Sequence, residues 1–387
     1  MKGNTQLRQE SLKKVLAEIR KSGPVSKREL QKITGFSWGN ISSIITLLCD
    51  SGYIVSAGKQ DTGIGRKPDE YDINIDNNFI IGVDFSSAWV FALVCDLRGR
   101  IVKEFKVDIP YTKACRTREF AQKLLFKIVG EAVEFCNGKN VSYIAVAMQG
   151  DVDTVNGISV NLSSIDKWEN VPVCQMLEEK FNVKTVMLHD PDCVIYAERF
   201  YGALADDDIN NAVEIRFEHG LGIAAILDGK IYKGNNGRTC EIRKMLVPSK
   251  NEDGYNSLTE ILGGMENLTK AYYKAAGDKV SFEALGELAR NGNKHALGIF
   301  NEVITALAFA LSNVCALYNP DKIVIFGELN KVEDLIIDCL EGLISELMEE
   351  DEIIPKIEIS KLDYTAAAVG AALFAADYMI EQLYFEK

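Results

Sequence analysis

The stretch that determines the fold of the N-terminal part runs from Pro24 to Leu48 and reads PVSKRELQKITGFSWGNISSIITLL. Ser26 and Glu29 have the spacing of a capping box, in which the serine hydroxyl and the glutamate carboxylate satisfy the first amides of a helix. Gly35 can adopt the left-handed conformation that ends such a helix. The stretch therefore predicts a short helix after Ser26, a turn at Gly35 and a second helix that Ser37 caps.

The flanking residues complete a winged helix-turn-helix. A first helix is predicted before Gly23-Pro24, because apolar residues recur there at roughly helical spacing: Leu7, Leu12, Val15, Leu16 and Ile19. The helix after Ser37 has its own apolar face: Ile41, Ile44, Ile45 and Leu48. Two strands, near residues 52–55 and 71–73, enclose a glycine-rich loop at residues 58–68. We expect this domain to span residues 1–76.

The outer face of the helix after Ser37 is the candidate DNA-reading surface, because recognition helices use their N-terminal residues on base edges. Its candidate contacts are Ser37, Trp38, Asn40, Ser43 and Thr46. Arg66 and Lys67 of the loop are candidates for a phosphate or a narrow minor groove. Two alternatives stay open: Trp38 could belong to the core of the domain, and the domain could be a three-helix protein-interaction module.

The charge distribution favours the DNA-binding alternative. Residues 1–70 hold 12 Lys and Arg against 7 Asp and Glu, a net charge of +5. The whole chain carries −13, so residues 71–387 carry −18. DNA binding requires cationic side chains at the phosphates, and an acidic body repels DNA unless a basic segment is set apart from it. The first 70 residues are therefore predicted to contact DNA, while the remainder has another task.

Composition excludes several other classes of protein. The chain is 47% hydrophobic, which fits a globular protein, and its most apolar stretch, 303–318, is interrupted by polar residues and too short to cross a bilayer. Nine cysteines are scattered without a Cys-x-x-Cys pair, which indicates reduced thiols and argues against a disulfide framework and a structural zinc site. Residues 1–20 do not resemble a signal sequence. We expect a cytoplasmic protein with no membrane partner, no metal and no cofactor.

From residue 79 onward the pattern is α/β. Buried strands are predicted near residues 79–84, 90–96, 101–107, 143–147 and 184–188, and a second series near 212–217, 223–227 and 322–326. Both series contain paired strands with a tight turn, then helices and a further strand. This repetition suggests two duplicated lobes around a cleft, the first at about 77–200 with the C-terminal helix and the second at about 201–364.

Several short motifs in this body resemble the ROK family, whose name stands for repressors, open reading frames and sugar kinases. They occur in the family's order over nearly the whole chain: Gly82-Val83-Asp84, Asp190 after a strand, Gly220-Leu221-Gly222, Cys240-Glu241-Ile242 and Gly327-Glu328. The wing ending Gly65-Arg66-Lys67-Pro68 is also similar to that of the family's repressors. The resemblance implies an actin-like, two-lobed sugar-kinase fold behind the winged helix-turn-helix.

The nucleotide-binding motifs of the family are altered in this chain. Where ROK kinases have Asp-x-Gly-Gly-Thr, the chain has Asp84-Phe85-Ser86-Ser87-Ala88. Where they have Gly-Thr-Gly-x-Gly, it has Glu218-His219-Gly220-Leu221-Gly222, so a carboxylate stands where phosphates would lie. The cysteine-rich zinc loop of the family is replaced by residues 249–258, which contain no cysteine. The sequence therefore predicts a body that has lost phosphotransfer.

The sugar-binding residues are better preserved. The resemblance implies that Asp190 stands at the general base of the kinases, here a vestige, and that Glu241 and Glu260 stand where sugar hydroxyls are bound. The other candidate ligand contacts are Gly150, Asn161, His189 and Lys244. Each residue has a structural alternative, such as capping a turn or satisfying a backbone group. For Lys244 the alternatives are a sugar phosphate or acid and a salt bridge to Glu241.

Together these features predict a sugar-responsive transcriptional regulator, most simply a repressor of carbohydrate metabolism genes. It would bind double-stranded operator DNA as a homodimer or a dimer of dimers, since one recognition helix reads only a half-site. A sugar or sugar derivative in the cleft would change the spacing of the heads. Two alternatives are an ATP-dependent sugar kinase with a DNA-binding head, which Asp190 favours, and a DNA-binding protein whose body is only a dimerisation scaffold.

Overall fold

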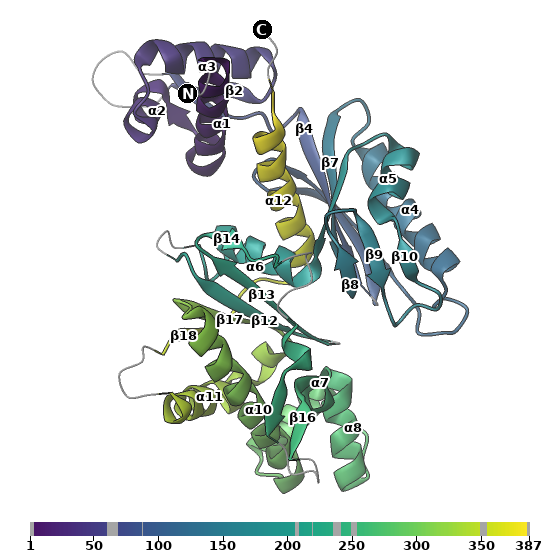
Figure 1. Ribbon diagram of the computed structural model, residues 1–387. Coiled ribbons are helices and arrows are strands. Elements are labelled where there is room, and N and C mark those ends of the chain that lie inside the picture. Colours follow the sequence, from purple (N-terminus) through teal and green to yellow (C-terminus); the bar gives the residue numbers. More distant parts are fainter. Residues whose placement is uncertain are drawn as a thin grey trace. The chain divides into compact units, whose positions relative to one another are not determined.

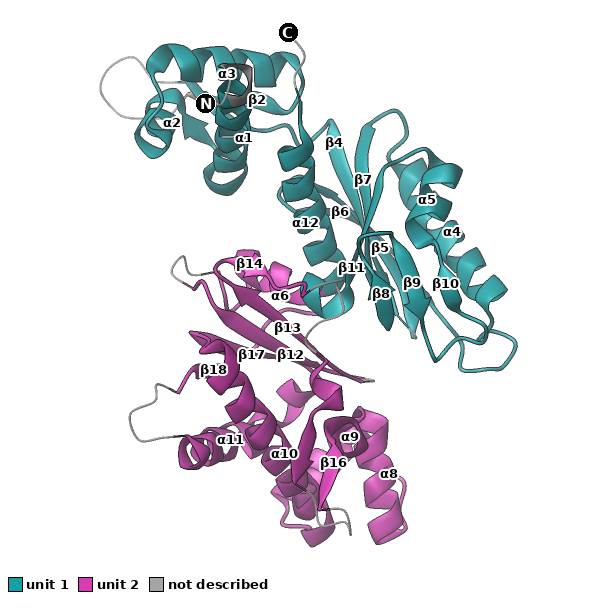
Figure 2. Cartoon of the chain, viewed as in Figure 1, with its two compact units in different colours: residues 1–193, 367–387 teal, residues 194–366 magenta. Residues whose placement is uncertain are grey.

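A computed structural model describes residues 4–59, 69–86, 88–205, 209–218, 220–234, 241–248, 254–348 and 354–384 (Figure 1). The described chain forms two compact units (Figure 2). The first unit comprises residues 1–193 and 367–387, and the second comprises residues 194–366. The second unit is therefore inserted between two segments of the first.

The N-terminal domain of the first unit has the predicted winged helix-turn-helix fold. Its elements are α1 (Asn4–Ser22), β1 (Val25–Ser26), α2 (Lys27–Thr34), α3 (Trp38–Asp50), β2 (Ile54–Lys59) and β3 (Asp69–Ile73). The strands form a small antiparallel sheet in the order β1-β3-β2. The predicted apolar faces of α1 and α3 are buried except at Leu7, which is 49% exposed.

The rest of the first unit is built on a five-stranded sheet in the order β11-β7-β4-β5-β6. β4, β7 and β11 are parallel, while β5 and β6 continue the sheet in an antiparallel meander. A separate small sheet has the order β10-β9-β8. The elements are β4 (Asn78–Phe85), β5 (Trp89–Asp96), β6 (Ile101–Asp108), α4 (Arg118–Phe135), β7 (Asn140–Met148), β8 (Asp151–Asp153), β9 (Ile158–Asn161), β10 (Glu169–Val171), α5 (Val173–Phe181), β11 (Thr185–His189) and α12 (Ala366–Gln382).

Helices cover both faces of this sheet, which explains why its central strands β4, β5 and β7 are mainly apolar and buried along most of their length. α4 and α5 pack on one face and α12 on the other (Figure 1). β4 approaches α12 closely at Gly82, where a Cβ atom would lie 2.2 Å from the backbone oxygen of Ala368. Only glycine allows this separation, so Gly82 is required for the packing of α12.

The second unit repeats the same strand pattern. Its sheet has the order β14-β13-β12-β17-β18, with β12, β17 and β18 parallel and β13 and β14 antiparallel. The duplication predicted from the sequence is therefore confirmed in the topology. The elements are α6 (Asp190–Tyr201), which begins in the first unit, β12 (Ala212–Phe217), β13 (Leu221–Leu227), β14 (Lys230–Ile231), η1 (Ile242–Lys244), β15 (Leu246–Pro248), β16 (Tyr255–Ser257), α7 (Leu258–Leu262), α8 (Met265–Ala276), α9 (Phe282–Arg290), α10 (Lys294–Tyr318), β17 (Lys322–Gly327), η2 (Glu328–Val332), α11 (Glu333–Leu347) and β18 (Lys356–Ile359).

α10 is the central core helix of the second unit. Among the described residues it is the one helix whose length and composition would suffice to cross a membrane, but 61% of its most apolar window is buried within the fold. Its buried residues pack with those of the β12–β17 sheet and of α8, α9 and α11 in a single core cluster. This burial accounts for the apolar character of α10 without a membrane.

Candidate functional site

The start and the end of α2, the helix before the turn to α3, are fixed by the signals that the sequence contains. The amide of Glu29 donates to the Ser26 hydroxyl at 3.3 Å, and the Glu29 carboxylate accepts from the Ser26 amide at 2.8 Å. Hydrogen bonds from the Ser26 hydroxyl and amide hold the pKa of Glu29 below its usual range. Gly35 ends α2 in the left-handed conformation, with φ of 72°. The capping box thus fixes the start of α2, and Gly35 fixes its end before α3 begins.

The N-terminal part of α3 presents an exposed face. Trp38 is 55% exposed, so it does not belong to the core of the domain. Ser43 and Thr46 are also exposed, and Asn40 is half-buried. This face offers hydrogen-bonding groups and one large aromatic ring to a partner, as a recognition helix does.

Two hydroxyls of the predicted DNA surface have local partners. The Ser37 hydroxyl accepts from the amide of Asn40 at 3.3 Å and so caps α3, but it keeps its proton for a further donor interaction. The Thr46 hydroxyl donates to the backbone oxygen of Ser42 at 3.0 Å, which leaves it as an acceptor with an exposed methyl group. Arg66 and Lys67 lie outside the described residues, between strands β2 and β3 of the wing.

In the body of the first unit, the strand register brings the predicted sugar-site residues to one edge of the sheet. Phe85 of β4 pairs with Met148 of β7, and Met148 pairs with His189 of β11. These residues mark the carboxyl ends of three adjacent parallel strands, where open α/β sheets bind their ligands. Gly150 and Asp190 follow within two residues and therefore lie at the same edge.

Gly150 and Asn161 are neighbours at this edge. Gly150 has φ of 90°, and a Cβ atom there would lie 2.4 Å from the backbone oxygen of Asn161. The close approach of the two chain segments is sufficient to require glycine at position 150, whether or not a ligand binds there. Asn161 ends β9 and its side chain is exposed, so its amide is available to a ligand at this edge.

His189 and Asp190 form the most enclosed polar pair of the predicted set. The Nε2 atom of His189 lies 3.4 Å from Oδ1 of Asp190. The Asp190 side chain is 10% exposed and stands in the first turn of α6, where the helix dipole stabilises a carboxylate. A largely desolvated carboxylate beside an imidazole can accept hydrogen bonds from a polyol and discriminate the positions of its hydroxyls.

The predicted residues of the second unit have partners of their own. The Glu241 carboxylate accepts from Nε of Arg243 at 2.6 Å, and Nζ of Lys244 lies 3.6 Å from the same oxygen. Of the two alternatives for Lys244, the structure thus contains the salt bridge to Glu241. Glu260 forms a capping box with Ser257, whose amide donates to its carboxylate at 2.7 Å. Thr259 ties this helix to the loop by donating to the backbone oxygen of Arg243 at 2.7 Å.

The turn that corresponds to the first phosphate motif of the kinases is filled by side chains. Asp84 is fully buried at the end of β4, and Nε1 of Trp89 donates to its carboxylate at 2.8 Å. Phe85 stacks on the buried Trp168 with ring centroids 5.0 Å apart. Nζ of Lys106 lies over the Trp89 ring at 4.6 Å. An indole therefore occupies one side of the carboxylate, a contact that the sequence alone does not predict.

The turn after β12 contains an ion pair in place of a glycine-lined phosphate site. The guanidinium of Arg216, which is largely buried, lies 2.7 Å from the carboxylate of Glu218. The Glu218 backbone is anchored as well, since its oxygen accepts from the amide of Met265 at 3.0 Å. A nucleotide phosphate at this turn would compete with Glu218 for Arg216, which opposes phosphate binding.

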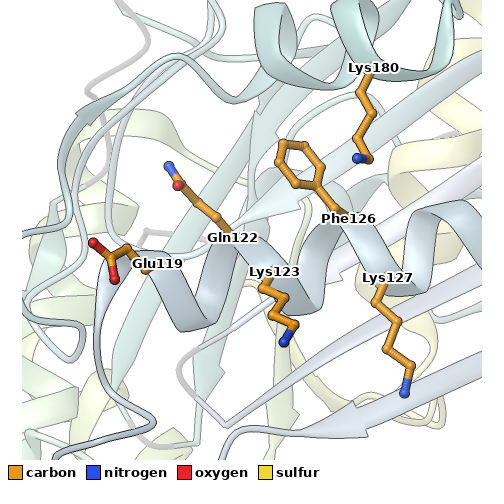
Figure 3. Close-up of a pocket in the computed structure, with 6 residues that line it drawn as sticks. All are labelled: Glu119, Gln122, Lys123, Phe126, Lys127 and Lys180. Carbon is orange, nitrogen blue, oxygen red and sulfur yellow. The ribbon is translucent and has the colours of Figure 1, made fainter.

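A surface pocket of about 480 Å³ lies elsewhere in the first unit, on α4 and α5 (Figure 3). It is lined by Glu119, Gln122, Lys123, Phe126, Lys127 and Lys180. The predicted sugar-site residues do not line this pocket. Among the described residues, no group of three or more His, Cys, Asp or Glu side chains could hold a metal ion.

Comparisons with known proteins identify relatives of both the N-terminal domain and the body of the chain. Residues 8–55 match a family of winged helix-turn-helix DNA-binding domains. Over 96% of both chains, the sequence is 20% identical to the xylose repressor of Bacillus subtilis strain 168. It is 23% identical to the DNA-binding transcriptional dual regulator NagC of Escherichia coli K12, over 84% of this chain and 81% of that protein.

Solved structures show the same fold. A ROK family transcriptional regulator, described as a homologue of the Escherichia coli MLC protein, superimposes with a TM-score of 0.81 at 21% identity over 97% of both chains. A ROK family glucokinase from Streptomyces griseus, in complex with glucose and AMPPNP, matches with a TM-score of 0.63 at 21% identity, over 76% of this chain and 98% of that one. The ROK family pattern itself matches residues 80–378, most of the length of the chain, and the protein therefore belongs to the ROK family.

Proposed function

We propose that the protein is a sugar-responsive transcriptional repressor. The observation that carries this proposal is the exposed face of α3, which belongs to a winged helix-turn-helix joined to a ROK body. Ser37, Trp38, Asn40, Ser43 and Thr46 would contact operator DNA, together with Arg66 and Lys67 of the wing. Because DNA is the partner, the protein would act in the cytoplasm.

The operator would be bound by a homodimer or by a dimer of dimers. One recognition helix reads only a half-site, and two half-sites about one helical turn apart match a two-fold axis. We propose that residues 1–76 form the DNA-binding domain and that residues 77–387 form the effector-binding body. Analytical ultracentrifugation with and without operator DNA measures the subunit number directly.

The effector would be a sugar or sugar derivative. His189 and Asp190 would bind its hydroxyls, with Gly150 and Asn161 at the same edge of the sheet. Glu241, Lys244 and Glu260 are further candidate contacts, although each has a partner within the protein. A xylose repressor and, in Escherichia coli O6:H1, an N-acetylglucosamine repressor that is 23% identical are among the relatives, so a monosaccharide is the first class to test.

We further propose that the body does not transfer phosphate. The indole of Trp89 donates a hydrogen bond to the buried Asp84, and Glu218 forms an ion pair with Arg216 at the second turn. The rival function is a sugar kinase, which the enclosed Asp190 favours. Asp190→Asn separates the two, because a kinase would lose turnover with ATP, whereas a sensor would change only its affinity for sugar.

The test is a thermal-shift panel of xylose, N-acetylglucosamine, glucose, their phosphates and the related sugar acids, each with and without Mg-ATP. A ligand at about 100 times its dissociation constant adds roughly 2.7 kcal/mol of apparent stability. We expect one sugar to stabilise the protein whether or not Mg-ATP is present and to change its affinity for operator DNA. Stabilisation only with Mg-ATP would favour the kinase. No response to any sugar would favour the dimerisation scaffold.

A further inference from the structure

The last turn of α1 is held by an arginine from the body of the first unit. Carbonyl groups at the end of a helix have no partner within the helix and attract cations. Arg98, in the turn between β5 and β6, donates from Nε to the backbone oxygen of Arg20 at 3.0 Å. It also donates from Nη2 to the backbone oxygen of Ile19 at 2.8 Å. A single side chain of the body thus completes the C-terminal cap of a DNA-binding-domain helix.

The turn that carries Arg98 is organised by a buried carboxylate. Asp96 is 3% exposed, and its Oδ1 atom accepts from the amides of Arg98 at 2.8 Å and Arg100 at 3.1 Å. Its Oδ2 atom accepts from Nε of Arg100 at 2.8 Å. The two bonds from the amides fix the backbone of the turn, so the direction of Arg98 is set by the sheet of the body and does not depend on the Arg100 side chain.

Arg98 also contacts a second element of the DNA-binding domain. Its Nη1 atom donates to the carboxylate of Asp72, in the wing strand β3, at 3.2 Å. Gly23 lies against the same guanidinium, and a Cβ atom there would be 2.5 Å from Nη2 of Arg98. The guanidinium therefore fits a space bounded by α1, β3 and Gly23, which restricts the domain to one orientation on the sheet.

A second arginine makes the reciprocal connection. Arg20 of α1 is 5% exposed, although it carries a charge. It donates to the backbone oxygen of Leu97 and, from Nη2, to that of Leu373 at 3.1 Å, and it forms an ion pair with Asp377 of α12. Breaking a buried charged contact on one side leaves an uncompensated ion, so such a joint favours a single geometry strongly.

We propose that Arg98 and Arg20 are positioning residues that fix the DNA-binding domain on the sheet of the first unit. This inference rests on the proposed function, since it concerns how the two recognition helices of a dimer keep their spacing. If the domain hung on a flexible linker, its two copies could reach half-sites at many separations. With the contacts of Arg98 and Arg20 intact, the first unit determines the separation of the two recognition helices. A motion within that unit then changes how the helices fit the operator.

The experiment starts with duplexes selected from a random DNA pool by the full-length wild-type protein. Affinity is then measured by fluorescence anisotropy for the selected duplex and for one whose half-sites are moved apart by about five base pairs, half a helical turn. The readout is the ratio of the two dissociation constants. We expect the wild type to disfavour the shifted duplex roughly tenfold or more, within the usual range of coupling between sites.

Arg98→Met should bring this ratio close to one, because the domains become free to follow the shifted half-site. Arg100→Met is the matched control, since Arg100 lies in the same turn but its side chain pairs with Asp96. That variant should keep the wild-type ratio. A merely structural defect would weaken binding to both duplexes equally and would leave the ratio unchanged.

The outcomes separate this inference from the proposed function. If the wild type selects no DNA, the proposed function fails. If the wild type selects DNA but its ratio is one, or if Arg98→Met keeps the wild-type ratio, the positioning role is refuted. If circular dichroism shows that Arg98→Met does not fold, Asp377→Asn decides by the same ratio, because it weakens the joint from the side of α12 and leaves Arg98 in place.

Discussion

The contact between Trp89 and Asp84 allows a quantitative prediction. Trp89→Phe keeps an aromatic ring at the end of the hairpin but removes the Nε1 proton that lies 2.8 Å from the Asp84 carboxylate. Asp84 is fully buried, so water cannot replace the lost donor without a rearrangement. Leaving a buried acceptor without its donor costs about 1–3 kcal/mol. We therefore expect Trp89→Phe to lower the free energy of unfolding of the first unit by about 2 kcal/mol.

The assay is urea unfolding followed by far-UV circular dichroism, because the substitution removes one of the three tryptophans and would distort a fluorescence signal. A double-mutant cycle with Asp84→Leu isolates the contact from the lost ring atoms. With leucine in place of the carboxyl group, Trp89→Phe should cost about 1 kcal/mol or less, since no buried acceptor loses its donor. An equal cost in both backgrounds would refute the conclusion that the indole stabilises Asp84.

Two further predictions concern the packing of α12 and a buried carboxylate. Gly82→Ala places a methyl group 2.2 Å from the backbone oxygen of Ala368 and should cost at least about 1–3 kcal/mol in urea unfolding, whereas Gly130→Ala, in the interior of α4 with its nearest contact at 3.6 Å, should be neutral or stabilising. Glu198 is fully buried, and burial raises its pKa above the ordinary 4.5, so the stability that it contributes is present at low pH and is lost as the pH rises through the folded-state pKa. Ser360→Ala removes a hydroxyl that donates to the Glu198 carboxylate and should raise the pKa of Glu198 further. The loss of stability caused by Ser360→Ala should therefore grow with pH when urea unfolding is followed between about pH 5 and 8. A loss that stays constant over this range would contradict the linkage.

The parts of the fold that the sequence predicted best are those with a strong local pattern. β12 has the predicted bounds of 212–217, because its apolar residues begin after the polar Asn211 and end before the polar Glu218. The capping box of Ser26 and Glu29 fixed the start of α2 in the same way. The strands β8, β9, β10, β15 and β16 were not predicted, since they are short and lack an apolar run.

The contacts within and around the candidate site were predicted less completely, for two reasons. Some contacts join residues that are far apart in the sequence, and some residues can serve either a structural role or a ligand. Glu260 illustrates the second case: Ser257 and Glu260 have the same spacing as Ser26 and Glu29, so the capping box could have been read from the sequence. The partners of Arg98 lie 78 and 79 positions away in α1, and no local pattern indicates such a pair. The contact between Trp89 and Asp84 likewise depends on how the β4–β5 hairpin folds.

The insertion of the second unit into the first also has a consequence for synthesis on the ribosome. The sheet of the first unit is complete at β11, and the 173 residues of the second unit separate it from most of α12, the helix that covers β4 at Gly82. At about 5–20 residues per second, α12 emerges roughly 10–30 s after β11. During that interval one face of the sheet and the buried Arg20 lack their partners on α12. The nascent chain thus exposes an apolar surface that a chaperone can bind, and its DNA-binding domain is fixed in place only after α12 has been made.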